Sequence, residues 1–190
     1  MSDDDVRALQ AKRDPSFEPV RFDDGFSREF PGAEASAAEV TLNLTVSGTL
    51  AINRVEELLA QYGLLLKSFN VLAVVGGADE PITPTTIAGR TFIGKTTVTS
   101  VLESLERNGL LRRYPHPTNR RSVLVDITDL GRRTCDEVLV RLHELETAWL
   151  ALMSEGDRQT FLKLLGIAKG LFARAQVPSR PPPQKPDLDR

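Results

Sequence analysis

Two helical patterns followed at once by a polar hairpin constrain the fold of this 190-residue chain more than any other feature. Thr83-Pro84 supplies a helix N-cap and a proline at the first helical position, and this helix is expected to end near Arg90. A second helix is expected from about Lys95 to Asn108. Its apolar stripe, at positions i, i+3, i+4 and i+7, consists of Val98, Val101, Leu102 and Leu105.

The hairpin follows the second helix directly. The stretches from Leu110 to Pro115 and from Ser122 to Ile127 have the composition of strands, and apolar residues alternate in the second. Residues 116–121 between them are polar and include turn formers, which favours a hairpin connection. Helix, turn, helix and then hairpin is the order of a winged helix-turn-helix unit.

Most of the remaining chain has helical periodicity. Apolar residues recur at helical spacing from about 40 to 62, although the start of this stretch, VTLNLTV, alternates as a strand does and leaves the boundary open. A short apolar run over 67–75 is closed by two glycines, and further helices are expected after Thr128 and after Ser154. The expected fold class is mainly α with a small β-hairpin wing, a winged helix-turn-helix plus a helical dimerisation region.

Five segments are expected along the chain. Residues 1–37 form an irregular, acidic arm, and residues 176–190 form a proline-rich tail. Between them lie an N-terminal helix of the dimerisation region (38–65), a winged helix-turn-helix DNA-binding domain (66–127) and C-terminal dimerisation helices (128–175).

Wide apolar stripes on the two C-terminal helices predict a homodimer, with packing inside one subunit as the alternative. On the first helix the stripe has intervals of 3, 4, 3, 4 and 3 and consists of Cys135, Val138, Leu142, Leu145, Trp149 and Leu152. The last helix adds Phe161, Leu164, Leu165, Ala168, Leu171 and Phe172. Because buried cysteines are usually inert, Cys135 is expected to be a structural core residue.

Charge is distributed unevenly along the chain. The whole sequence has 24 basic and 26 acidic residues, a net charge of −2 that by itself argues against a nucleic-acid partner. Residues 84–126, however, hold seven basic and three acidic residues, a local net charge of +4, which leaves −6 for the rest. Positive charge concentrated on a helix-turn-helix and hairpin predicts contact with double-stranded DNA.

Small hydroxyls and a cation occupy the polar side of the second helix, and arginines occupy the hairpin. Lys95, Thr96, Thr97, Thr99 and Ser100 are predicted to meet the major groove and nearby phosphates. Arg120 and Arg121 are predicted to meet the minor groove, with Arg112 and Arg113 near the DNA backbone. The alternative for each set is an ordinary solvated surface.

One motif indicates a different class of protein. The segment Gly89–Thr96 matches the phosphate-binding pattern GxxxxGK[ST], so a P-loop-like nucleotide-binding enzyme is an alternative. The context disfavours it, because the segment follows a helical pattern and no alternating βαβ order would build a parallel sheet. A winged helix used only for protein contacts is a further alternative, which the arginines disfavour. No residue is assigned to catalysis and no cofactor is predicted. A metal site is not expected, since the chain has only one Cys and two His.

Several segments together resemble the MarR family of winged-helix transcription regulators. These are LLLKSFNVLAVV, TPTTIAGRTFIGKTTVTSVLESLERNGLLRR, HPTNRRSVLVDIT and DLGRR, within about residues 40–175. The resemblance implies a homodimeric repressor whose recognition helices enter successive major grooves of a pseudo-palindromic operator. It places the family's wing arginine at Arg121, whereas the family's wing aspartate is replaced by Asn119 and a frequent serine cap by Gly94.

The resemblance also implies a small aromatic or phenolic effector that binds between the dimer helices and the winged unit. Asn43, Arg54 and Tyr62 lie on the first dimer-region helix and could line such a cleft, or could equally be surface or packing residues.

The acidic N-terminus is not a secretory signal, and no apolar run approaches the roughly 20 residues that span a bilayer. A cytoplasmic protein is therefore expected.

Overall fold

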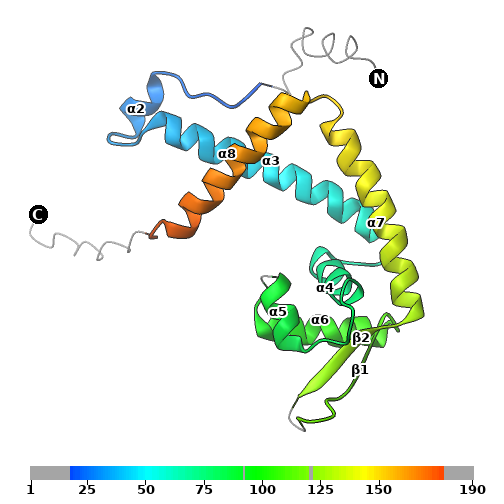
Figure 1. The fold of residues 1–190 in the computed structure, drawn as a ribbon. Helices are drawn as coiled ribbons and strands as arrows, with labels where there is room; N and C mark the ends of the chain where they lie inside the picture. Colours follow the sequence, from blue (N-terminus) through cyan, green and yellow to red (C-terminus); the bar gives the residue numbers. More distant parts are fainter. Residues whose placement is uncertain (1–17, 92, 120–121, 178–190) are drawn as a thin grey trace, which may run out of the picture. The chain divides into compact units, whose positions relative to one another are not determined.

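The structure, a computed structural model, describes residues 18–91, 93–119 and 122–177. It divides into two compact units, 1–149 and 150–190, which are described separately. Almost all elements belong to the first unit (Figure 1): α2 (Gly25–Glu29), α3 (Ala35–Ala60), α4 (Leu66–Gly76), α5 (Pro84–Thr91), α6 (Lys95–Arg107), β1 (Leu111–Pro115), β2 (Val123–Ile127) and α7 (Asp129–Leu150). The second unit contains α8 (Glu155–Arg174).

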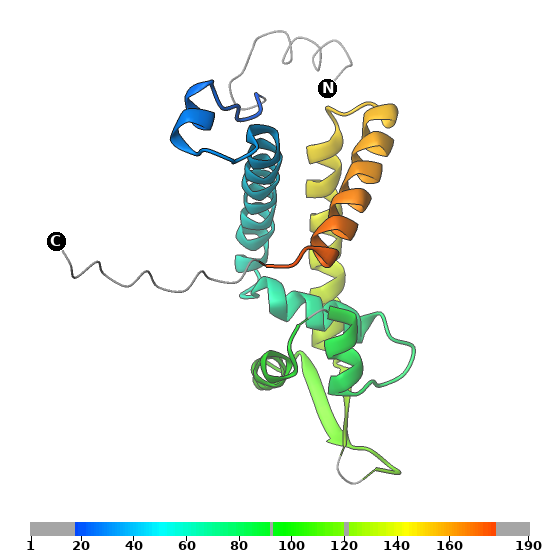
Figure 2. The same ribbon diagram turned by 90° about the vertical axis from the view of Figure 1, so that its left-hand side faces the viewer.

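Helices α4, α5 and α6 pack together and against a two-stranded antiparallel hairpin that projects beyond them (Figure 2). The hairpin register runs from Leu111 opposite Ile127 to Pro115 opposite Val123. Ile82, which precedes α5, forms a bridge to Val125 on the other edge of β2, with N–O distances of 2.8 and 3.0 Å. This extra strand-like contact was not anticipated from the sequence, and it ties the hairpin to the start of α5.

The hydrophobic core lies within this winged unit and its immediate flanks. Leu72 of α4, Ile87 of α5, Val98 and Leu102 of α6 and Val125 of β2 are almost completely buried. All of the buried core residues lie between Leu59 and Val138, so most of α3, the second half of α7 and the whole of α8 contribute none. The expected stripe of α6 is thus confirmed as a core face.

The VTLNLTV stretch, whose alternation left the helix boundary open, is part of the 26-residue helix α3. Its threonines adapt to the helix, because each hydroxyl donates to the carbonyl oxygen four residues earlier. Thr41 bonds to Ala37 at 2.9 Å, and Thr45 and Thr49 bond to Thr41 and Thr45 at 2.8 Å. In the helix, each threonine hydroxyl thus finds a hydrogen-bond acceptor on its own chain.

The segment expected to be an irregular arm contains the short helix α2 and docks onto α3. Asn43 accepts the Val20 N–H at 2.8 Å and donates to the Val20 carbonyl at 2.9 Å. Glu39, which is buried, accepts the Phe22 N–H at 2.8 Å and the Arg21 guanidinium at 2.7 Å. Phe22 also stacks on Phe26, with ring centroids 4.3 Å apart. Residues 1–17 of the expected arm, and 178–190 of the expected tail, lie outside the described residues.

Helix caps follow the sequence signals. Thr83 accepts the Thr86 N–H at 3.2 Å before α5, and Thr128 accepts the Gly131 N–H at 3.0 Å at the start of α7. Ser154 accepts the Asp157 N–H at 3.2 Å before α8, in the second unit. Helix α6 differs, since its N-cap Gly94 has no side chain to accept a hydrogen bond.

Candidate nucleic-acid interface

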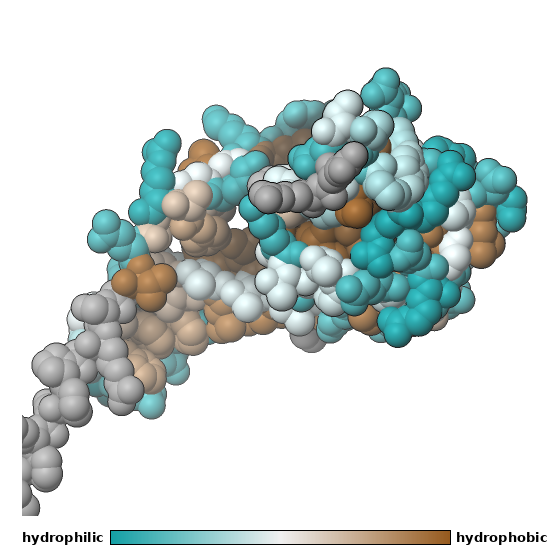
Figure 3. Space-filling model, turned by 90° about the horizontal axis from the view of Figure 1, so that it is seen from below, coloured by the Kyte–Doolittle hydropathy of each residue, from teal (hydrophilic) through white to brown (hydrophobic). Residues whose placement is uncertain are grey.

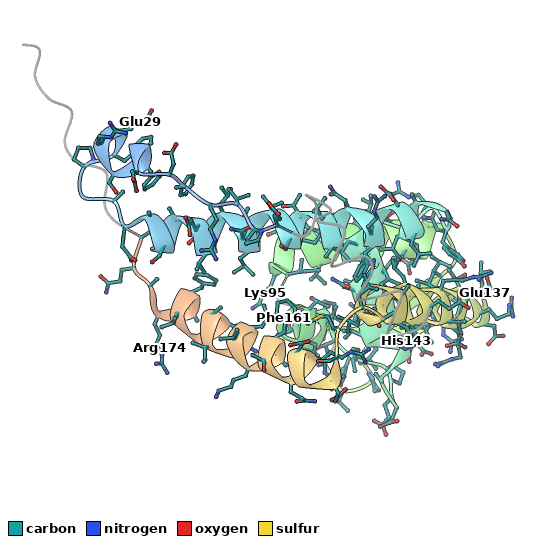
Figure 4. All side chains as sticks on the ribbon, turned by 90° about the horizontal axis from the view of Figure 1, so that it is seen from above. Glu29, Lys95, Glu137, His143, Phe161 and Arg174 are labelled. Carbon is teal, nitrogen blue, oxygen red and sulfur yellow. The ribbon has the colours of Figure 1, made fainter. Side chains whose placement is uncertain are left out.

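Helix α6 separates a buried apolar face from an exposed polar one. Lys95, labelled in Figure 4, is its first residue, and Thr96, Thr99 and Ser100 share its exposed side. Thr97 is half-buried, so it lies at the edge of this face rather than at its centre. Seen from below (Figure 3), hydrophilic residues dominate the surface on the right of the picture, where the winged unit lies.

The hydroxyls of α6 differ in their availability. Thr99 donates to the Lys95 carbonyl at 3.2 Å, and Ser100 donates to the Thr97 carbonyl at 2.9 Å, so both protons are used within the helix. The side chains of Thr96 and Thr97 make no hydrogen bond within the described part of the chain. An exposed hydroxyl without an internal partner can donate or accept at a base edge without first breaking a bond, which singles out Thr96.

Arg112 and Arg113, at the base of the hairpin, are both held by carboxylates of the protein. Arg112 bonds to its cross-strand partner Asp126, with Nη2 at 2.5 Å and Nε at 3.1 Å from Oδ2. Arg113 bonds to Glu106 in the last turn of α6. The hydrogen bonds to Asp126 and to Glu106 raise the pKa of the respective guanidinium further above its ordinary value. Both guanidiniums therefore already have a carboxylate partner within the protein, and their expected position near the DNA backbone remains a prediction.

The tip of the hairpin carries the remaining arginines of the prediction. Arg120 and Arg121 lie outside the described residues, so their contacts remain a prediction. Up to this gap the hairpin is closed by a bond from the His116 N–H to the Ser122 carbonyl at 3.1 Å and one from the Ser122 N–H to the Asn119 carbonyl at 2.9 Å. These two bonds link His116 and Asn119 to Ser122 at the end of the two strands.

The three residues considered for an effector cleft are not brought together. Asn43 is occupied by the docked arm, and Arg54 forms an exposed pair with Glu57 at 2.7 Å. Tyr62 packs against the core of the winged unit and also interacts with Arg141 of α7. Asn43 and Arg54 are about 16 Å apart along the helix axis at 1.5 Å per residue. The described contacts do not bring the three side chains together around one pocket, and their role in effector binding remains a prediction.

The phosphate-binding motif has the wrong structural context for a nucleotide site. Gly89–Thr96 spans the end of α5 and the start of α6, so the first glycine lies inside a helix rather than after a strand. A P-loop leaves a buried parallel strand and surrounds phosphates with backbone amides. Within the described residues the only sheet is the antiparallel hairpin, and no cluster of His, Cys, Asp or Glu could hold a metal ion.

Cys135 is buried at the junction of α7, α4 and β2. Burial raises the pKa of its thiol above the ordinary value, and the nearby Asp136 acts in the same direction. A small cavity of about 120 Å³ beside it is lined by Ala73, Gly76, Gly77, Ile127, Arg132, Asp136 and Leu139. A thiol that is both protonated and enclosed is a poor nucleophile, which agrees with the expected structural role.

Sequence reasoning missed the acidic partners at this site. Glu106 and Asp126 were counted only as local negative charge, although each one binds an arginine of the hairpin. The sequence contained part of the information needed to find the Arg112–Asp126 pair, because the residues that face each other across a hairpin are fixed once its register is known.

No helix among the described residues is both long enough and apolar enough to cross a membrane.

Comparison with known proteins identifies relatives of this chain in sequence. The sequence profile described as "MarR family" matches residues 62–122. The HTH-type transcriptional regulator PecS of Dickeya dadantii is 34% identical over 121 residues, which cover 62% of this chain and 73% of PecS.

Solved structures match the fold. The Staphylococcus aureus MepR–DNA complex has a TM-score of 0.63 at 18% identity, covering 70% of this chain and 96% of MepR. CouR of Rhodococcus jostii RHA1, bound to p-coumaroyl-CoA, has a TM-score of 0.61 at 20% identity, covering 77% of this chain and all of CouR. The predicted winged-helix fold is thereby confirmed.

Proposed function

Since this chain belongs to the MarR family, we propose that it binds a pseudo-palindromic operator as a homodimer and represses transcription until a small effector releases it. The chain is a DNA-binding transcription regulator and not an enzyme, as the sequence analysis predicted. We infer the DNA-binding residues, the association of the subunits and the effector from the structure and the relatives. The regulator acts in the cytoplasm.

The exposed polar face of α6 beside a projecting hairpin is the observation that carries the proposal. Lys95, Thr96, Thr97, Thr99 and Ser100 enter the major groove or contact its phosphates, with Thr96 the best placed to read a base edge. The hairpin tip, with Arg120 and Arg121, reaches the adjacent minor groove, where the negative potential favours arginine. Arg112 and Arg113, each paired with a carboxylate, hold the base of this wing and lie near the DNA backbone.

Exposed apolar side chains on α3 and on α8 support a homodimer. On α3, Val40 is 65% exposed and Leu42, Val46 and Leu50 are also exposed. On α8, Phe161 (Figure 4) is 45% exposed, and Leu164, Leu171 and Phe172 are exposed as well. Exposed apolar side chains in such number are unfavourable in water and typical of an interface, and a twofold dimer would cover equivalent patches on both subunits.

The effector part of the proposal rests on the relatives. CouR is bound to p-coumaroyl-CoA, an acyl thioester with an aromatic group, and a small aromatic or phenolic effector is proposed for this chain by analogy. Such a ligand would release DNA by binding more tightly to the dimer that is not bound to the operator. Asn43, Arg54 and Tyr62 are not proposed as one shared site, because their positions separate them.

Fluorescence anisotropy with a labelled duplex from the gene's own upstream region tests the proposal. We expect specific binding whose affinity falls steeply with salt, and about a fivefold loss for Thr96→Val, which removes one base-edge hydrogen bond. Thr45→Val, at an exposed threonine of α3, is the matched control and should leave binding unchanged. Association that is weak and insensitive to salt, or tight ATP binding without DNA binding, would refute the proposal.

A further inference from the structure

One carboxylate joins the recognition helix to the wing through three hydrogen bonds. Glu106, in the last turn of α6, accepts the Arg113 backbone N–H on Oε1 at 3.1 Å. Its Oε2 accepts Arg113 Nε at 2.8 Å and Nη2 at 2.5 Å. Because both the main chain and the guanidinium of Arg113 are held, this contact restrains the direction of strand β1 as well as a side chain.

The Glu106–Arg113 pair is better shielded than the other ion pairs of the described residues. The Arg113 side chain is 29% exposed and that of Glu106 is 36% exposed, whereas each of the other paired arginines is more than 60% exposed. Exposed pairs contribute little and exchange readily with water. A forked guanidinium–carboxylate contact that is partly buried has a defined geometry and suits a positioning role.

Core contacts also hold the base of the hairpin, because Val125 and Ile127 of β2 are buried in the core together with the start of β1. Leu110 and Leu111 anchor its base in the core, and Ile82 holds the outer edge of β2. Beyond Arg113 the ribbon has only two strands, and such ribbons are marginally stable alone. At 3.3 Å per residue the six residues from Arg113 to residue 119 span at most about 20 Å, so a rotation of about 10° at the base moves the tip by up to about 3–4 Å.

We propose that Glu106 and Arg113 are positioning residues that set the angle between the wing and α6, so that both elements engage the same operator. This inference rests on the proposed function, since it assumes that the α6 face and the wing tip both contact DNA. Arg113 then contributes to binding through the wing arginines rather than through a phosphate of its own. The pair determines which part of the minor groove the wing tip can reach. It thereby affects the affinity for the DNA sequence on either side of the bases that α6 contacts.

The direction of change in affinity separates this role from simple electrostatics. Glu106→Gln removes a negative charge near DNA and frees the Arg113 guanidinium, so electrostatics alone predicts tighter operator binding. A positioning role predicts weaker binding, because the wing loses its fixed angle. Glu103→Gln is the matched control, since Glu103 is an exposed acid of the same helix that makes no hydrogen bond within the described residues, and it should bind as tightly as the wild type or more tightly.

The experiment measures operator affinity and hydroxyl-radical footprints of the full-length protein. For Glu106→Gln we expect at least a fivefold loss of affinity and loss of protection in the flanking minor grooves, with the central major-groove contacts retained. In an Arg121→Ala background the same change should cost almost nothing more, because both substitutions disable one wing. Arg113→Lys, which keeps the charge but loses the fork, should behave as Glu106→Gln does.

Thermal melting and circular dichroism check that each variant folds, and Arg113→Lys serves as the test if Glu106→Gln does not. Unchanged or tighter binding by folded Glu106→Gln, or additive losses with Arg121→Ala, would overturn the positioning role. Failure of the wild-type protein to bind any upstream duplex would instead count against the proposed function itself.

Discussion

Arg112 and Asp126 face each other across the hairpin as register partners, and their side chains form an ion pair with Nη2 and Oδ2 2.5 Å apart. The pair joins the two strands near the base of the wing. An arginine that the sequence assigned to the DNA backbone thus has a carboxylate partner inside its own hairpin. The arginines of the wing consequently fall into two groups, those that hold the hairpin at its base and those at its tip.

The two groups should respond differently to substitution. Arg121→Ala should weaken operator binding by about 1–3 kcal/mol while leaving the dimer intact, because it removes a DNA contact. Arg112→Ala should cause a much smaller loss of affinity and a slight fall in the thermal midpoint, since it removes a link within the hairpin. Anisotropy titrations at physiological salt, together with size-exclusion chromatography, measure both effects. Equal losses of affinity for the two variants would contradict this division.

Gly131 should be intolerant of a side chain. A Cβ at this position would lie 2.0 Å from the Leu110 carbonyl oxygen and 2.9 Å from its carbon, so helix α7 could not approach the hairpin as it does. We expect Gly131→Ala to lower the free energy of unfolding by about 3 kcal/mol or more.

Gly89→Ala is the matched control for that substitution, because a Cβ there has open space and the residue lies within α5. It should raise stability by about 0.5–1 kcal/mol. Denaturant unfolding of both variants gives the comparison, and a Gly131→Ala protein as stable as the wild type would show that the contact can relax.

Docking of the arm on α3 should depend on pH through Glu39. The hydrogen bond from the Phe22 N–H and the pairing with Arg21 lower the pKa of Glu39 below its ordinary value. A carboxyl with a lowered pKa in the folded state contributes stability above its unfolded pKa, and that contribution is lost as the pH falls through the folded pKa. Hydrogen-exchange protection of the Phe22 amide should therefore decline in acid.

Two substitutions separate the charged and neutral parts of this contact. Glu39→Gln should weaken the docking and remove its dependence on acid pH, because the amide does not titrate in this range. Asn43→Ala should weaken the docking at every pH, since it removes the neutral bonds to Val20 and leaves Glu39 in place. Protection of Phe22 that stays constant through the titration of Glu39 would exclude this carboxylate as the determinant.

Cys135 should react slowly and have no regulatory effect. Its thiol is buried and its pKa is raised, so little thiolate is present at neutral pH to attack an alkylating agent or a peroxide. We expect slow modification by iodoacetamide in the folded protein, fast modification in denaturant, and operator affinity that peroxide leaves unchanged. Rapid modification of the native protein, with loss of DNA binding, would indicate an oxidant sensor instead.

The sequence predicted the elements of the winged unit closely. The expected helix from Lys95 to Asn108 is observed as Lys95–Arg107, and the hairpin strands differ from expectation by one residue at their starts. These features are local, because a stripe at helical spacing, a cap or a turn is encoded within a few neighbouring residues. The strand-like alternation of VTLNLTV left the helix boundary open for the same reason, since the hydroxyl bonds of its threonines form only in the helix.

The partners of the charged residues were decided by the tertiary structure. Arg113 meets Glu106 only because α6 and β1 pack at one angle, and Arg112 meets Asp126, 14 residues away, only through the hairpin register. Glu39 likewise meets Phe22 and Arg21 through the docking of the arm. Periodicity and composition determined that this chain forms a winged helix with a basic face. Which of its cations are free to bind DNA depends on distances between segments that are remote in sequence, and these exist only in the folded chain.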